Sequence, residues 1–382
     1  MKPIIEPSLT QLVSYFLKLG TVGFGGPIAL VGRMQKDLVE DRGWVTPEVY
    51  KEGLTLAQLS PGPLAAQLAI YLGWAEAGVL GATLVGLAFV LPSFLMVITF
   101  AILYIHYGGL PWIQKLFYGI GAVVIAIIIQ GAIKLIKKNV GRDWVLIGLW
   151  IISAAITIAT ESEILWVFLL SGFAAVLIKS PPPLKPKTVL FSIVPVWLFT
   201  GLHGSGDLGG LKDIALFFTK SGISVFGSGL AIVPFLYGGV VQHFHWLNER
   251  QFLDAVAVAM ITPGPVVITV GFIGYLVAGF LGAVTAAAGT FLPCYLFVVL
   301  LAPHFHRFAQ NPRVKAFVNG VTASAIGAIT GAAFTLGKRA IIDLPTLLIL
   351  AVSCFLLFRV KRVPEPALIV LGGVAGFILK SV

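Results

Sequence analysis

The chain has 382 residues, of which 58% are hydrophobic and only 11% are charged, and its formal net charge is +10. Soluble globular domains carry about 25% charged residues and need a wetted exterior, so this composition excludes an ordinary soluble protein and favours one that spans a lipid bilayer. The basic residues stand in short clusters between apolar runs, which is typical of a membrane topology signal and argues against a nucleic-acid partner.

The first ten residues lack the basic, apolar and small-residue regions of a cleaved signal peptide, so the first apolar run is expected to be retained. The two cysteines, Cys294 and Cys354, lie inside apolar runs and are expected to pack there. Two cysteines are too few for a disulfide framework or a cysteine metal site. We therefore expect no cofactor and no metal.

Apolar runs along the chain predict an all-α polytopic membrane protein with about 13 transmembrane segments, since a helix needs about 20 residues to cross the apolar core. These runs cover residues 9–35, 53–75, 77–105, 112–136, 143–160, 163–178, 188–202, 213–239, 252–276, 278–302, 314–337, 341–358 and 365–381. The run at 188–202 is short and contains Pro195, so it is the weakest of the thirteen.

Charge supports that short run. Four basic clusters connect the runs, at residues 134–142, 179–187, 307–315 and 359–362. With thirteen spans all four clusters fall on one side, which the positive-inside rule makes the cytoplasm; without the run at 188–202 the last two would flip outward. The N-terminus is then cytoplasmic and the C-terminus external.

The sequence matches itself when it is shifted by 202 residues. Lys18 meets Lys220, Trp44 meets Trp246, and the Pro-Gly-Pro triplet at 61–63 meets the one at 263–265. Recurrent glycine and proline alone would be unremarkable in a membrane protein, but the lysine and tryptophan matches are not explained in that way. The sequence therefore divides into a first transporter repeat at 1–180, a linker at 181–210 with the short span, and a second repeat at 211–382. An odd number of spans separates equivalent positions, so we expect inverted repeats, with a site near the bilayer midplane.

Each repeat contains two breaks in its apolar runs, at 20–30 and 60–63 in the first and at 222–232 and 262–265 in the second. Proline and glycine interrupt helices, and a broken helix at membrane depth is tolerated around a cavity. The N-terminus of the following half-helix attracts anions. The alternative is a set of simple kinks. The residues expected to contact substrate at the breaks are Gly25, Gly26, Gly227, Ser228, Ser60, Gly62, Thr262, Gly264 and Gln58.

Two lysines give a sharper signal. Lys18 lies about ten residues into its run, near mid-bilayer at 1.5 Å per residue, and Lys220 occupies the equivalent depth. A charge at that depth is costly and is usually functional, although a long lysine side chain can also reach an interface. We predict that Lys18 and Lys220 hold the substrate between the two repeats.

Two acids are also equivalent under the repeat. Glu52 and Asp254 each stand at the start of the second run of their repeat, before the Pro-Gly-Pro break. They are candidate coupling residues that carry protons or pair with the lysines. The alternative is a structural role, since an acid is favourable at a helix N-terminus.

The phrases FGGP at 24–27, RGW at 42–44, QLSPGP at 58–63 and FGSG with TPGP in the second repeat resemble the chromate ion transporter family, in its long two-domain form and over essentially the whole chain. The resemblance implies a multi-pass protein of a prokaryotic plasma (inner) membrane that exports chromate and confers resistance. Some relatives are discussed as sulfate or general oxyanion carriers. The second repeat departs from the first with Ser228 and Gly229 in place of Gly26 and Pro27, which leaves open whether both repeats bind equally.

Chemistry agrees with a chromate or sulfate-type oxyanion, because lysines, hydroxyls and half-helix N-termini suit a tetrahedral dianion. An oxyanion channel and an uptake carrier are the alternatives within membrane transport. An enzyme is not expected, because the spans contain no nucleophile–base set or cluster of metal ligands. A homodimer stays open.

Overall fold

The computed structural model describes residues 7–24, 26–108, 110–160, 165–181, 210–225, 229, 232–305, 311–360 and 363–380. These residues are largely α-helical and form no β-strand, so the predicted all-α class is confirmed for them. Gly25, Gly227, Ser228 and the short run at 188–202 lie outside the described residues.

The helix bounds repeat along the chain. The first repeat comprises α1 (Leu9–Val22), α2 (Gly26–Met34), η1 (Gln35–Asp41), α3 (Pro47–Leu59), α4 (Leu64–Tyr107), α5 (Pro111–Leu135), η2 (Ile136–Val140), α6 (Trp144–Thr160) and α7 (Leu165–Lys179). The second comprises α8 (Leu211–Ser224), α9 (Ile232–Leu236), η5 (Tyr237–His243), α10 (Glu249–Ile261), η6 (Val266–Ile268), α11 (Thr269–Leu301), η7 (Ala302–His304), α13 (Pro312–Ala340), α14 (Leu344–Arg359) and α15 (Glu365–Leu379). The bounds of α1, η1 and α3 recur 202 residues later in α8, η5 and α10. The repeat is therefore one of backbone structure as well as of sequence.

The runs at 9–35 and 53–75, each predicted as one span, instead double back as helical hairpins. The Tyr15 hydroxyl donates a hydrogen bond to Asp37 at 3.1 Å, so α1 and η1 lie side by side. A Cβ on Gly53 would overlap the ring of Tyr71, so α3 packs against the first part of α4. The glycine and proline breaks turn the chain back because they end one helix and start the next within a few residues.

A second reversal divides α4. Ala77 has φ −142° and ψ 32°, and Gly78 has φ 58° and ψ −143°, so a short half-helix at 64–76 precedes a long helix at 79–107. Gly73 and Gly81 face each other so closely that a Cβ on either would overlap the carbonyl of the other. In α11, Ala278 and Gly279 take nearly the same dihedral angles. Only glycine adopts this positive φ without strain, which explains its position at both reversals.

The second repeat forms the same hairpins. The rings of Phe217 on α8 and Phe235 on α9 stack with centroids 5.6 Å apart, so the run at 213–239 also doubles back. The run at 252–276 also doubles back, and Gly274 lies so close to Gly282 that a Cβ on either would overlap the carbonyl of the other. Thirteen crossings are therefore not confirmed, because these four runs fold back on themselves as pairs of short helices. Two hairpins in each repeat would remove an even number of crossings, so the prediction that the basic clusters share one side does not depend on them.

The described part of the chain contains two groups of apolar helices that differ in length. Four are long and apolar enough to cross a membrane by length and composition, Leu64–Tyr107, Pro111–Val140, Val266–His304 and Pro312–Ala340. Four more are shorter apolar helices, Trp144–Thr160, Trp166–Lys179, Leu344–Arg359 and Glu365–Leu379.

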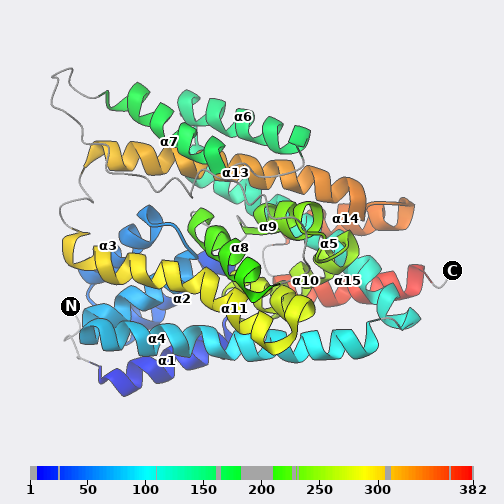
Figure 1. The fold of residues 1–382 in the computed structure, drawn as a ribbon, viewed down its shortest axis with the longest axis horizontal. Coiled ribbons are helices and arrows are strands. Elements are labelled where there is room, and N and C mark those ends of the chain that lie inside the picture. The colour runs from blue at the N-terminus through cyan, green and yellow to red at the C-terminus, as the bar shows by residue number, and fades with distance from the viewer. Residues whose placement is uncertain are drawn as a thin grey trace.

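The helices form two bundles that both repeats share (Figure 1). The hairpin bundle consists of α1–α4 and α8–α11, in which α4 and α11 pack on each other. The straight-helix bundle consists of α5–α7 and α13–α15; here α6 and α7 pack on α13, and α14 and α15 pack on α5. In Figure 1, α6, α7 and α13 form the upper layer while α1, α4 and α11 form the lower one. The repeats are thus intertwined, since the last two helices of each cover a helix of the other.

The repeat-equivalent helices α5 and α13 are antiparallel. Tyr118 near the start of α5 and Arg339 at the end of α13 line one cavity, whereas Lys138 and Asn319 line another. Tyr118 and Lys138 are about 30 Å apart at 1.5 Å per residue, close to the thickness of a bilayer core. We call these two ends of the molecule the Arg339 end and the Lys138 end.

Described members of the basic clusters gather at the Lys138 end. Lys179 pairs with Asp143, which follows directly after η2. The helix α13 begins at this end, and α14 finishes there, because Gln130 of α5 donates a 2.8 Å hydrogen bond to the carbonyl of Leu357. The described members of these four clusters therefore lie at one end of the molecule, and the side of the membrane that this end faces stays a prediction.

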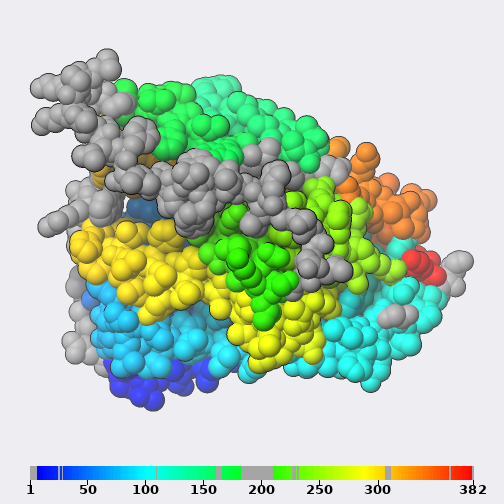
Figure 2. Space-filling model, in the orientation of Figure 1, coloured from blue at the N-terminus to red at the C-terminus, as the bar shows by residue number. Residues whose placement is uncertain are grey.

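The outer surface is apolar. Leu80, Leu87, Leu91 and Leu95 follow one face of α4 at helical spacing, and Leu87 is 58% exposed. The cyan surface of α4 and the yellow surface of α11 adjoin in Figure 2. Continuous exposed leucine along a long helix suits contact with lipid tails rather than with water.

Candidate functional site

The tips of the hairpins meet inside the molecule. The N–H of Gly62 donates to the carbonyl of Val225 at 2.6 Å, and the N–H of Gly264 donates to the carbonyl of Gly23 at 2.8 Å. Gly23 and Val225 are 202 residues apart, as are Gly62 and Gly264, so each Pro-Gly-Pro tip bonds to the end of the first helix of the other repeat. The four sequence breaks thus come together at the contact between the repeats.

This central contact is tightly packed. Gly62 has φ +138° and Gly264 has φ +101°, both in the region that side chains disfavour. A Cβ on Gly62 would lie 2.7 Å from the Cys294 sulfur, and one on Gly264 would overlap the Ser93 side chain. Ser93 and Cys294 are 201 residues apart, so they occupy nearly equivalent positions in the two repeats. No side chain fits at either glycine, so the two tips pack closely against the facing repeat in this conformation.

The polar residues at the Pro-Gly-Pro tips are buried. Ser60 and Thr262 end α3 and α10, and the Thr262 hydroxyl donates back to the carbonyl of Val258 at 2.7 Å. Gln67, one turn into α4, is fully buried, and its amide nitrogen donates to the carbonyl of Pro61 at 2.6 Å. Its amide oxygen has no hydrogen-bond partner among the described residues. The tips therefore contain polar groups that the apolar core would otherwise disfavour.

A cavity of about 120 Å³ opens beside the first Pro-Gly-Pro tip, between the hairpin of α3 and α4 and the helices α5 and α13. Its lining comprises Thr55, Gln58, Leu59, Leu64, Leu135, Lys138, Asn139, Val318, Asn319 and Thr322. Six of these carry hydrogen-bond donors, and none of these lining residues is acidic. We call this the Lys138 cavity.

The arrangement suits an anion. The half-helix of α4 begins at Leu64, and Pro63 before it makes no side-chain cap. The first N–H groups of a helix lack an acceptor four residues back and lie at its positive end. Lysine, amide and hydroxyl donors converge with this helix end on one small space. Such a set binds tetrahedral oxyanions well, because each oxygen accepts several hydrogen bonds.

The two predicted lysines lie elsewhere on the hairpin bundle. Lys18 is exposed on α1, on the side away from the Leu12, Phe16 and Leu19 face that packs on α4. Lys220 is half-buried on α8, and its carbonyl accepts a hydrogen bond from Ser224. Gly26 begins α2 with φ +71° and has open space where a Cβ would lie.

The two acids lie one turn deeper than expected. Thr46 caps α3 and Asn248 caps α10, so Glu52 and Asp254 fall in the second helical turn rather than at the N-terminus. Asp254 is only 5% exposed and accepts a 2.7 Å hydrogen bond from the Tyr104 hydroxyl, which belongs to the other repeat. Glu52 is half-buried. A capping role is thereby removed for both acids, because other side chains cap these helices.

Sequence reasoning included Gln58 in the site but missed the other donors of the Lys138 cavity. Lys138 served only as a topology charge, although its recurrence as Lys338 marks the position as part of the repeat. Asn139, Asn319 and Thr322 give no local signal, because they reach the cavity from two helices that are distant in sequence.

Comparison with known proteins agrees with this picture. The sequence profile of the chromate transporter family matches residues 10–176 and again residues 212–377, once for each repeat. The chain is 56% identical to a chromate transport protein of Cupriavidus metallidurans, over 97% of this chain and 93% of that protein. It is 55% identical to a probable chromate transport protein of Synechococcus elongatus, over 98% and 96%. An uncharacterized transporter of Methanocaldococcus jannaschii is 29% identical over 93% and 90%.

No solved structure matches the chain. Its apolar helices and its transporter relatives make it a multi-pass membrane protein. The profile covers both repeats and the identities extend over nearly the full length, so the chain belongs to the chromate transporter family.

Proposed function

We propose that this protein carries chromate outward across a prokaryotic plasma membrane and thereby confers chromate resistance, as a transporter and not an enzyme. The observation that carries the proposal is the Lys138 cavity, where one ammonium group, several neutral donors and the start of α4 converge and no acid lines the space. The names of the relatives add support, since two of them are chromate transport proteins. Sulfate is a near isostere and the same donors would accept it.

In this proposal the oxyanion binds between the Pro-Gly-Pro hairpin and the helices α5 and α13. Gln58 and the start of α4 supply donors from the hairpin bundle, and Lys138 supplies charge from the straight-helix bundle. The two-lysine site at Lys18 and Lys220 stays a prediction and is the alternative position for the substrate. A channel or an uptake carrier stays the alternative function.

We further propose inverted repeats with the N-terminus in the cytoplasm and the C-terminus outside. The antiparallel course of α5 and α13 and the basic residues at the Lys138 end support this orientation. Single cysteines that replace Lys138 and Lys361, the second of which lies outside the described residues, should both react with a reagent applied from the cytoplasmic side. External reaction at Lys361 would contradict the orientation.

The test of function is chromate uptake by inverted membrane vesicles, in which export appears as accumulation. We expect saturable uptake and counterflow, because a carrier exposes its site to one side at a time. Lys138→Gln should lower uptake at limiting chromate while Lys338→Gln, at the equivalent exposed position, should not. Uptake that never saturates would favour a channel, and no chromate uptake would overturn the proposal.

A further inference from the structure

We propose that Arg339 is a second oxyanion-binding residue at the opposite end of the transport path, and that the Glu249 carboxylate occupies it in the conformation described here. The inference rests on the proposed function for the identity of its anion. In this view, Glu249 acts as an internal competitor that the transported oxyanion displaces when the hairpin bundle moves.

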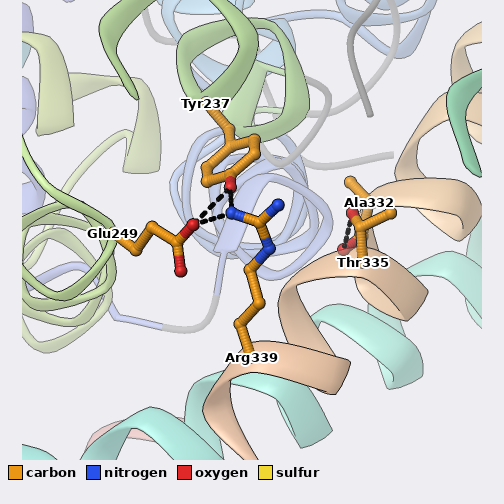
Figure 3. A network of polar contacts seen from close by, with 5 residues as sticks. All are labelled: Tyr237, Glu249, Ala332, Thr335 and Arg339. Atoms are coloured by element: carbon orange, nitrogen blue, oxygen red, sulfur yellow. Dashed lines mark hydrogen bonds and ion pairs between the residues drawn. The ribbon is translucent and has the colours of Figure 1, made fainter. Parts of the chain in front are cut away.

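A compact polar network joins the two bundles at the Arg339 end (Figure 3). Arg339 of α13 forms an ion pair with Glu249 at the start of α10 and donates a hydrogen bond to the hydroxyl of Tyr237. The guanidinium carbon also lies 5.2 Å from the centre of the Tyr237 ring. Guanidinium groups bind carboxylates and tetrahedral oxyanions with the same forked donors, so Glu249 takes the place that an oxyanion would use.

The network borders a cavity of about 230 Å³ that contains further positive charge. Arg250 and Lys380 line it together with Arg339 and Glu249. Its second acid, Asp254, already accepts a hydrogen bond from Tyr104. Three cations therefore face two carboxylates, and an incoming dianion would find positive charge beyond that which Glu249 neutralises.

The repeat relates this cavity to the Lys138 cavity. Under an offset of 200 residues Arg339 corresponds to Asn139, which lines the Lys138 cavity, and Tyr118 corresponds to Val318, which does so too. The walls formed by α5 and α13 are thus equivalent at the two ends. If residues of α5 and α13 bind substrate at the Lys138 end, the equivalent residues are placed to bind it at the Arg339 end.

The facing hairpins are not equivalent. At the Lys138 end α3 presents Thr55 and Gln58, close to its Pro-Gly-Pro tip. At the Arg339 end α10 presents Glu249 and Asp254, which correspond to positions 47 and 52, near the start of the hairpin. The difference is about seven residues, or roughly 10 Å of helix. The hairpin bundle is therefore displaced along α5 and α13 toward the Lys138 end.

A slide of about 10 Å in the other direction would give the Arg339 end the geometry that the Lys138 end has now. Ala257, the counterpart of Thr55, is 1% exposed and would then line the cavity opposite Arg339. Glu249 would move past Arg339, so their ion pair must break. The side chains of Arg339 and Glu249 are 26% and 48% exposed, and ion pairs this open to water contribute little stability and exchange readily.

The first experiment needs no substrate. In the full chain in sealed membranes, Ala257→Cys is exposed to a membrane-impermeant maleimide from the side of the Arg339 end. We expect slow labelling in the otherwise unchanged chain and labelling several-fold faster with Glu249→Gln or with Arg339→Gln. The unsubstituted chain, with Cys294 and Cys354, gives the background, and Glu48→Gln, an exposed acid in the first turn of α3, is the matched control. If neither Glu249→Gln nor Arg339→Gln speeds the labelling of Ala257→Cys, and at least one of the two variants keeps its thermal stability, the inference is overturned.

The second experiment measures the chromate-dependent rise in melting temperature of the purified chain. Glu249→Gln should bind chromate about tenfold more tightly, because the internal competitor is gone, and Glu249→Gln combined with Arg339→Gln should lose that gain. A gain that persists in the double variant would exclude Arg339 as the site. If no variant responds to chromate while Glu249→Gln still accelerates Ala257→Cys labelling, chromate is not the ligand. The Arg339–Glu249 ion pair would then still hold the hairpin bundle in its present position.

Discussion

The two ends of the molecule share their helices but not their side chains. At the Arg339 end an ion pair ties α13 to the start of α10, whereas the equivalent positions at the Lys138 end are Asn139 and Pro47, which cannot form one. The Lys138 end instead has a small donor-lined cavity that reaches the Pro-Gly-Pro tip.

This difference bears on the proposal that the hairpin bundle slides along α5 and α13. Two inverted repeats of identical sequence would have equal energies in the two displaced arrangements. In the sliding proposal, the Arg339–Glu249 ion pair between the bundles favours one arrangement. A substrate that competes for Arg339 would favour the other, because a ligand shifts a two-state equilibrium by its differential affinity.

The largest effect is expected where the two repeats are alike. Gly62→Leu and Gly264→Leu should each abolish transport, because both glycines have positive φ and a side chain would meet Cys294 or Ser93 from the facing repeat. Chromate uptake in inverted vesicles is the measurement, with melting temperature as the check on folding.

Gly78→Ala is the control for these two substitutions. Gly78 also has positive φ, at +58°, but open space surrounds the place of its Cβ. Its substitution tests backbone strain without a clash and should leave measurable transport. Normal transport in both Gly62→Leu and Gly264→Leu would mean that the tips do not shape the path.

A smaller effect is expected from single cations, and here the repeats should differ. Lys138→Gln should raise the Kd for chromate roughly tenfold to a hundredfold, since a hydrogen bond to a charged group is worth about 1.5–3 kcal/mol. Lys338→Gln should change it little. Lys18→Met and Lys220→Met test the alternative two-lysine site by the same measurement. Wild-type affinity in both would eliminate that site, and a loss there without a loss in Lys138→Gln would move the substrate to those lysines.

The smallest effect is expected from the two acids. An inside-negative potential already favours export of a dianion by about 2.3 kcal/mol per charge per 100 mV, so proton coupling is not required. Asp254 is buried against Tyr104 of the other repeat, whereas Glu52 is half-buried, so Asp254→Asn should change the pH profile of transport more than Glu52→Gln. Tyr104→Phe should resemble Asp254→Asn. An unchanged profile in all three variants would leave both acids a structural role.

Much of the site was predictable because glycine and proline act locally. A Pro-Gly-Pro triplet ends a helix whatever surrounds it, so the breaks at 61–63 and 263–265 could be located from sequence alone. The repeat also led us to expect that these two breaks lie together at the contact between the two repeats. The hairpins could not, because an apolar run of about 20 residues reads alike whether it crosses the bilayer or returns at its middle.

Hydropathy, glycine and proline are local properties, so the all-α membrane class, the repeat and the breaks could be read from the sequence. The tertiary structure alone decided which distant helices face each other. Lys138 and Asn319 are 181 positions apart along the chain and line one cavity only because α5 and α13 are antiparallel. The pairing of Arg339 with Glu249 likewise depends on how the two bundles pack on each other, which no single segment encodes.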